Sequence, residues 1–151
     1  MKKQIKKTNK KQQSGRSMIE MVGVLAVMGL ITAGAFVLIS SANSSSRRNR
    51  VVDDVMNIAA GVRALYADAD ALPTTMPSGI LTLVNGPTKT PYNSDYTVTT
   101  DTNTTFKIAF STKTDADCKA LAAKQWKDTV SHTTTCTASN SVYPFEVVYG
   151  K

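Results

Sequence analysis

A long apolar run near the start of the chain limits the structures that this protein can adopt. Residues 18–39 read MIEMVGVLAVMGLITAGAFVLI, with one charged side chain, Glu20, and no proline. A helix of this length rises about 33 Å, close to the hydrocarbon thickness of a bilayer. Its three glycines lower helix propensity in water but are common in membrane helices. The run therefore predicts a helix that crosses a membrane.

The excess positive charge of the chain lies before this run. Residues 1–15 hold six lysines and no acid, whereas residues 16–151 hold 12 basic and 11 acidic residues. Flanking lysines tend to stay in the cytoplasm, so the C-terminal part is expected to be exported. The nearly neutral remainder argues against a nucleic-acid-binding domain, whose charge should lie on a folded face. The arginines that follow the run are interpreted as a solvated helix face or as neighbours of lipid headgroups: Arg47, Arg48 and Arg50.

Three interpretations of the run compete. The simplest is a signal anchor that holds a small domain outside the membrane. The second is a secretory signal peptide cut after Ala42, because small residues occupy the two required positions. Against it, the run exceeds the usual length of about 7–15 residues. The third must also explain Glu20, because a lone carboxylate in a membrane helix is costly and marks a functional site.

A cut between Gly15 and Arg16 would supply the cation that Glu20 lacks. It would leave a free α-amino group on Arg16, one helical turn from Glu20 or presented to it by a neighbouring chain. With this glycine, this glutamate, the basic leader and the apolar stretch 18–39, the sequence resembles the type IV prepilin family. That family comprises type IV pilins, minor pilins and the pseudopilins of type II secretion. The resemblance covers roughly residues 10–45 closely.

The resemblance implies a set of processing steps and partners. A prepilin peptidase would cleave after Gly15, and the same enzyme typically methylates the new N-terminus. Arg16 departs from the family, which usually has Phe, Met or another apolar residue here, and this bears on methylation more than on cleavage. Glu20 matches the glutamate that pairs with a neighbour's N-terminal amine during filament assembly. The implied partners are identical or homologous pilin subunits, the inner membrane, and a pilus or type II secretion machinery.

The rest of the chain predicts a second helical half and a small head. A stripe at steps of four and three residues favours one long helix from about Ser17 to Ala71, which the serines of 40–46 could loosen: Val51, Val55, Ile58, Val62, Leu65 and Ala69. Pro73 disfavours helix in the residue before it. The expected organisation is a cleaved leader at 1–15, a membrane and assembly helix at 16–41, an amphipathic half at 42–72 and a head at 73–151.

The head is expected to be a small antiparallel sheet of three or four strands packed on the long helix, an α+β fold. Residues 73–94 hold four of the five prolines and predict a turn-rich connection. Alternation in 96–100 and 106–110, around a turn at 101–104, predicts a hairpin. A capping box at Thr114 predicts a helix over about 115–127, and 141–150 reads as a final strand pair or a single strand. Trp126 is interpreted as a core anchor on that helix.

Cys118 and Cys136 are the only cysteines, and they fall in the part expected to be exported, where disulfides persist. A disulfide is predicted, stabilising by about 3 kcal/mol in the chain-entropy model. The alternative, a metal or reactive thiol pair, has no ligand cluster around it. His132 is interpreted as an exposed loop residue. The family resemblance adds that such a disulfide bounds a variable C-terminal surface loop.

The sequence thus predicts a structural subunit rather than an enzyme. It has no glycine-rich phosphate loop and no catalytic triad, and no cofactor or metal is expected. The predicted function is a prepilin, inserted once in a bacterial inner membrane with a cytoplasmic N-terminus, then polymerised into an extracellular or periplasmic filament. The resemblance implies a filament for cell adhesion, motility, DNA uptake or secretion, and the sequence does not choose among these roles. The alternative is a non-polymerising membrane-anchored or secreted binding domain.

Overall fold

A computed structural model describes residues 18–151, and these divide into two compact units at the boundary between Ser40 and Ser41. The leader at 1–15 and the predicted cleavage residues Gly15 and Arg16 lie outside the described residues. Helix α1, Met18–Leu65, contributes residues to both units. Each unit is described by itself below.

The first unit consists of the apolar part of α1. Every residue from 18 to 40 is helical and exposed. Bulky side chains that would normally be buried are open to the surroundings, with Met18 at 87% and Phe36 at 76% of full exposure. This helix is the only candidate membrane span among the described residues, judged by length and composition, and a signal sequence would pass the same test. No other part of the first unit buries these apolar side chains.

In the second unit, α1 turns one stripe of side chains toward a core. The buried positions of the helix are Val51, Val55, Ile58, Ala59 and Val62. Their spacing of three and four residues matches one helical face, so the predicted stripe is confirmed up to Val62. Residues 40–46 are helical, and the serines do not interrupt α1.

The predicted end of the helix was too late. Helix α1 ends at Leu65, six residues before Ala71, and Leu65 is 47% exposed. The following residues form turns, and the backbone N–H of Leu72 donates to Asn103 O at 2.8 Å. Carboxylates at 68 and 70 are unfavourable at the negative end of a helix dipole. The chain therefore leaves the helical path early and turns toward the sheet.

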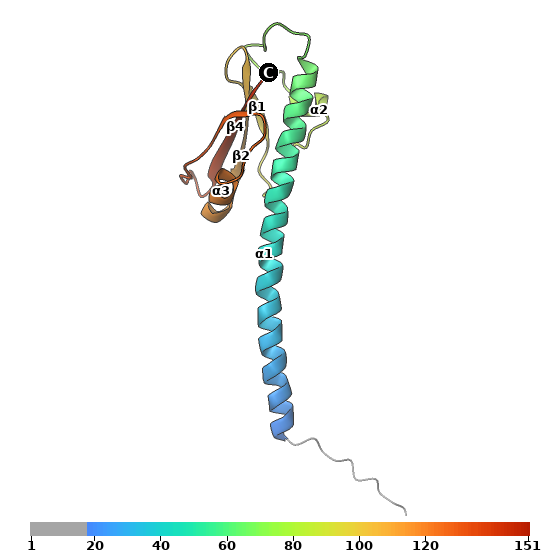
Figure 1. Ribbon diagram of the computed structural model, residues 1–151, viewed down its shortest axis with the longest axis vertical. Helices are drawn as coiled ribbons and strands as arrows, with labels where there is room; N and C mark the ends of the chain where they lie inside the picture. The colour runs from blue at the N-terminus through green and yellow to red at the C-terminus, as the bar shows by residue number, and fades with distance from the viewer. Residues whose placement is uncertain (1–17) are drawn as a thin grey trace, which may run out of the picture. The chain divides into compact units, whose positions relative to one another are not determined.

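The sheet of the second unit has four antiparallel strands in the order β1-β2-β4-β3 (Figure 1). Strand β1, Thr97–Thr100, forms the predicted hairpin with β2, Thr105–Thr112. Strand β4, Tyr143–Gly150, pairs with β2 over eight residues. Strand β3, Thr129–His132, pairs with the other edge of β4. No strand was predicted at this position, and His132 therefore lies in a strand rather than in an exposed loop.

One face of the two central strands supplies most of the aromatic core. Buried and exposed positions alternate along β2 and β4, as expected for a sheet with one covered face. Directly opposed residues bring rings together: Phe106 stacks on Tyr149 at 5.8 Å between centroids, and Phe110 lies 5.3 Å from Phe145. The stripe of α1 joins the same buried cluster. The second half of α1 therefore packs on the sheet, which is the α+β fold that the sequence predicted.

Two short helices complete the second unit. Helix α2, Ile80–Leu83, lies on the side of α1 opposite the sheet (Figure 1). Helix α3, Asp115–Ala122, begins where the capping box predicted, because Thr114 Oγ1 accepts the backbone N–H of Asp117 at 3.1 Å. It ends five residues earlier than expected. Trp126 thus lies beyond the helix, but it is buried as predicted, and its indole N–H donates to Leu121 O at 3.1 Å.

Candidate functional site

The first unit presents Glu20 on an otherwise apolar helix surface. Glu20 lies in the first turn of α1 and is exposed. Its neighbours on this part of the helix, such as Met21, Val24 and Met28, are apolar and exposed. Within residues 18–151, Glu20 belongs to no ion pair. The predicted partner, the amine of Arg16, lies outside the described residues, so the pairing stays a prediction.

The three glycines in the first unit have no packing role within the described chain. A Cβ atom added at Gly23, Gly29 or Gly34 would meet nothing within 4 Å. Each glycine costs a helix about 1 kcal/mol relative to alanine. Small residues let helix backbones approach each other closely in membranes. The surface of residues 18–40 therefore has the composition of a helix that packs against other helices.

The second unit contains the disulfide that the sequence predicted. Cys118 of α3 is bonded to Cys136, with 6.0 Å between the two Cα atoms. The Cys118 side chain is buried, whereas Cys136 is partly buried at the edge of the core. The enclosed segment includes β3 and Trp126, so the bond ties the edge of the sheet to α3.

Arginine contacts that sequence analysis missed hold α1 to the rest of the second unit. Arg48 Nη1 lies 3.2 Å from Asp117 Oδ1, with both side chains mostly buried. The guanidinium of Arg63 donates to Gly150 O at 2.8 Å and to Asp128 O at 2.9 Å. These partners are 65 to 87 residues apart in the chain, and no local pattern could have indicated them. Arg48 is therefore a structural contact rather than a solvated residue of the helix face.

Burial changes the acidity of groups around these contacts. Burial, followed by the nearby Asp117 carboxylate, raises the pKa of Tyr92 to about 12. Burial also raises the pKa of Tyr149 to about 12. The Asp54 carboxyl has a raised pKa because burial outweighs the hydrogen bond from Tyr96. These groups lie in or beside the core, and none of the phenols is poised to titrate near neutral pH.

Other polar side chains of the second unit are placed for structure. His132 Nε2 lies 3.1 Å from Ala122 O, and its ring lies 6.5 Å from those of Trp126 and Phe145. Within residues 18–151, no group of three or more His, Cys, Asp or Glu side chains is placed to hold a metal ion.

Comparisons with known proteins do not assign a family. No family model matches the chain, and neither a curated protein nor a solved structure is significantly similar to it.

Proposed function

We propose that the protein is a prepilin, a structural subunit of a type IV pilus or a related filament. The observation that carries this proposal is the exposed apolar helix over residues 18–39, with Glu20 in its first turn. An apolar surface of this size is unfavourable in water and is typical of a surface that contacts a membrane or another protein. A membrane covers it before assembly, and the same segments of other copies cover it in the filament.

Glu20 gives the proposed assembly its register. A carboxylate surrounded by apolar side chains must be neutralised or paired, because burying it alone costs several kcal/mol. Cleavage after Gly15 creates the α-amino group of Arg16, and this cation on a neighbouring copy pairs with Glu20. Glycines without packing partners in the described chain support close contact between the helices.

The proposal includes partners and a cellular location. A prepilin peptidase removes the leader at 1–15 and methylates Arg16, if the guanidinium there is tolerated. The chain spans a bacterial inner membrane once, and an assembly machinery moves it into a filament outside that membrane. The disulfide between Cys118 and Cys136 fits an exported unit, because disulfides persist in oxidising compartments.

The second candidate is a membrane-anchored or secreted binding domain that does not polymerise. Its support is that a plain anchor or a signal sequence would have the same length and composition as the apolar helix. In that case Glu20 would have no role in assembly, and the second unit would bind its ligand as a monomer.

The intact mass and N-terminal sequence of the protein distinguish these functions. The protein is isolated from membranes of a host that has the matching prepilin peptidase. A chain that begins at Arg16, two hydrogens lighter for the disulfide, supports the prepilin proposal, and the added mass of a methyl group would show methylation. A chain that begins at Met1 indicates an anchor, and one that begins at Asn43 indicates a secreted domain. Either of the last two results contradicts the proposal.

A further inference from the structure

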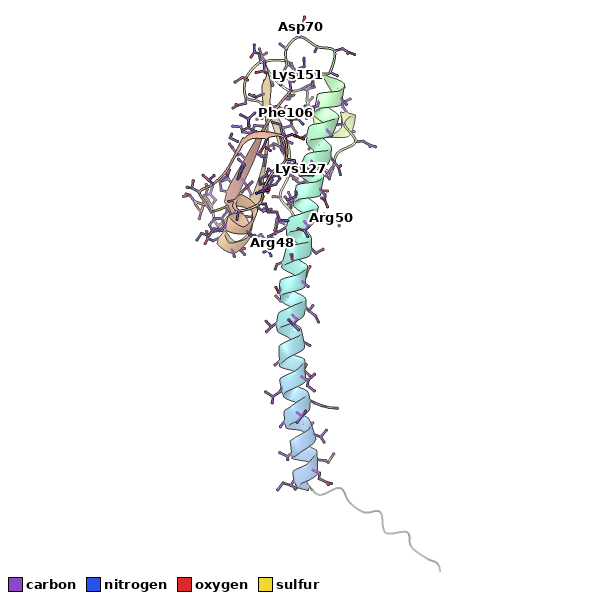
Figure 2. All side chains as sticks on the ribbon, in the orientation of Figure 1. Arg48, Arg50, Asp70, Phe106, Lys127 and Lys151 are labelled. Carbon is purple, nitrogen blue, oxygen red and sulfur yellow. A yellow bond between two sulfur atoms is a disulfide. The ribbon has the colours of Figure 1, made fainter. Side chains whose placement is uncertain are left out.

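The turn before β4 leaves the backbone N–H group of Ser141 without an acceptor. Asn140 and Ser141 form a two-residue turn with positive φ at both positions, 50° and 64°, as in a type I′ turn. Two backbone hydrogen bonds between Ser139 and Val142, of 2.7 and 3.0 Å, close this turn. Figure 2 labels Lys151 beyond one end of β4, and the turn precedes the other end. Asn140 and Ser141 are exposed, and within residues 18–151 the Ser141 N–H makes no hydrogen bond.

A free backbone nitrogen after an asparagine permits an intramolecular reaction of this thermolabile side chain. The nitrogen attacks the side-chain Cγ, so a new C–N bond forms and the Cγ–Nδ2 bond breaks. Ammonia leaves with the proton that the backbone nitrogen loses, and a five-membered succinimide ring remains. Water then opens the ring at either carbonyl, which gives aspartate or isoaspartate, and in isoaspartate the main chain runs through the side-chain carbon. Because the peptide group after the asparagine must rotate, a hydrogen bond on its N–H or close packing slows the reaction.

Asn85 is the position that the sequence alone would select for this reaction. It is followed by Gly86, which has no side chain to hinder the attack. In the structure, however, the Gly86 N–H donates to Leu81 O at 2.7 Å. The Gly86 backbone also lies against the core, because an added Cβ atom would be 2.9 Å from Cγ1 of the fully buried Ile58. The ring at Asn85 therefore closes only when this part of the core opens.

The other asparagines of the described chain are protected in the same way. After Asn93, the Ser94 N–H donates to Thr90 Oγ1 at 3.2 Å. After residue 103, the backbone N–H of residue 104 donates to Thr102 Oγ1 at 3.3 Å. The remaining three lie inside α1, where the following N–H belongs to the hydrogen-bond ladder of the helix: Asn43, Asn49 and Asn57. Within residues 18–151, Asn140 is thus the asparagine whose following N–H is free.

We propose that Asn140 is a site of spontaneous conversion to aspartate and isoaspartate in the folded protein. Rotation of the peptide group after Asn140 disturbs only the isolated pair formed by Ser139 and Val142. An exposed tip of this kind opens locally at a far smaller cost than the core around Gly86. Both products add a carboxylate to the turn that joins Cys136 to β4, and isoaspartate also lengthens the main chain by one methylene. The inference is independent of the proposed function.

Peptide mapping of the aged full chain tests this site. The protein, with its disulfide intact, is incubated in detergent at mildly alkaline pH, then reduced, digested with trypsin and analysed by mass spectrometry. Peptide 64–89 contains Asn85 as its only asparagine, and peptide 128–151 contains only Asn140. The exchange of an amide for a carboxyl group should accumulate in peptide 128–151 at least about tenfold faster than in peptide 64–89. An isoaspartyl methyltransferase, which labels isoaspartate, should label peptide 128–151.

Two controls separate the effect of the fold from that of the local sequence. In the denatured and reduced chain the order should reverse, because Gly86 hinders the attack less than Ser141 once both N–H groups are free. Asn140→Gln should abolish the change in peptide 128–151, since its longer side chain would need a six-membered ring, and should leave peptide 64–89 as in wild type. Two results would overturn the inference. One is a folded chain in which Asn85 converts as fast as Asn140, and the other is a denatured chain that keeps the order of the folded one.

Discussion

Glu20 is the residue on which the proposed assembly depends most. We expect Glu20→Ala to leave export and leader cleavage unchanged while filament yield falls at least about tenfold, because the neighbouring amine loses its counter-charge in an apolar interior. Total protein, N-terminal sequence and sheared filament measure the three steps separately. Glu20→Asp keeps the charge on a shorter side chain and serves as the control, with a smaller loss. Undiminished filaments of the alanine variant would remove the register role.

Gly61 shows how closely two segments of the second unit approach. A Cβ atom at this position would lie 2.6 Å from Val84 Cβ and 3.2 Å from Val84 O. Overpacking of this kind costs about 1–3 kcal/mol, whereas alanine gains about 1 kcal/mol of helix propensity. The difference is a net loss of up to about 2 kcal/mol, so we expect Gly61→Ala to lower the stability of the second unit by about 1 kcal/mol, measured by thermal unfolding.

The control for this variant is another glycine of the same helix. At Gly34 an added Cβ meets nothing within 4 Å, so Gly34→Ala should leave the unfolding temperature of the second unit unchanged. A double variant, Gly61→Ala with Val84→Gly, removes the overlapping side chain and should recover part of the loss. Equal stability of Gly61→Ala and wild type would show that the loop before β1 moves away at no cost.

At the scale of elements, the disulfide is expected to hold the edge of the sheet. Strand β3 pairs with β4 at only three positions, has an irregularity between Thr129 and Ser131, and leaves Val130 64% exposed. Closing the loop between Cys118 and Cys136 is worth about 3 kcal/mol in the chain-entropy model. Cys118→Ala/Cys136→Ala should lower the free energy of unfolding by about this amount and increase amide exchange in β3 before β2.

Reductant provides the control for the cysteine variant. It should lower the unfolding temperature of the wild-type protein to that of the variant and leave the variant unchanged. Equal amide exchange in β3 with and without the disulfide would mean that Trp126 and Phe145, whose tilted rings lie 5.8 Å apart, hold this edge alone.

Elements with a local signal were predicted, and elements built on distant contacts were not. The stripe of α1, the β1–β2 hairpin and the Thr114 cap each follow from residues within a few positions of each other. The sequence of β3 shows neither alternation nor a majority of apolar residues. As an edge strand it pairs only with β4, through an irregular register, and this pairing leaves no pattern in its own residues. Its formation depends on pairing with β4, which begins eleven residues after β3 ends. Glu20 was found from sequence because a charge within an apolar run is itself a local signal.

At the scale of the whole molecule, folding and association belong to different segments. Every residue of the buried cluster lies between Val51 and Tyr149, within the second unit. The exposed apolar side chains lie mainly between Met18 and Ile39, within the first. A unit with its own core and disulfide is expected to fold alone, whereas an exposed apolar helix associates with lipid, detergent or other copies.

A fragment of residues 41–151 tests this division. We expect it to be monomeric without detergent, to form the disulfide and to unfold in one cooperative transition, because it retains the complete buried cluster. The full chain should require detergent or form large assemblies under the same conditions. Sedimentation and thermal unfolding compare the two. A fragment that aggregates or lacks a cooperative transition would show that the second unit needs residues 18–40 to fold. A monomeric fragment would instead place association in the apolar helix, as the proposed filament requires.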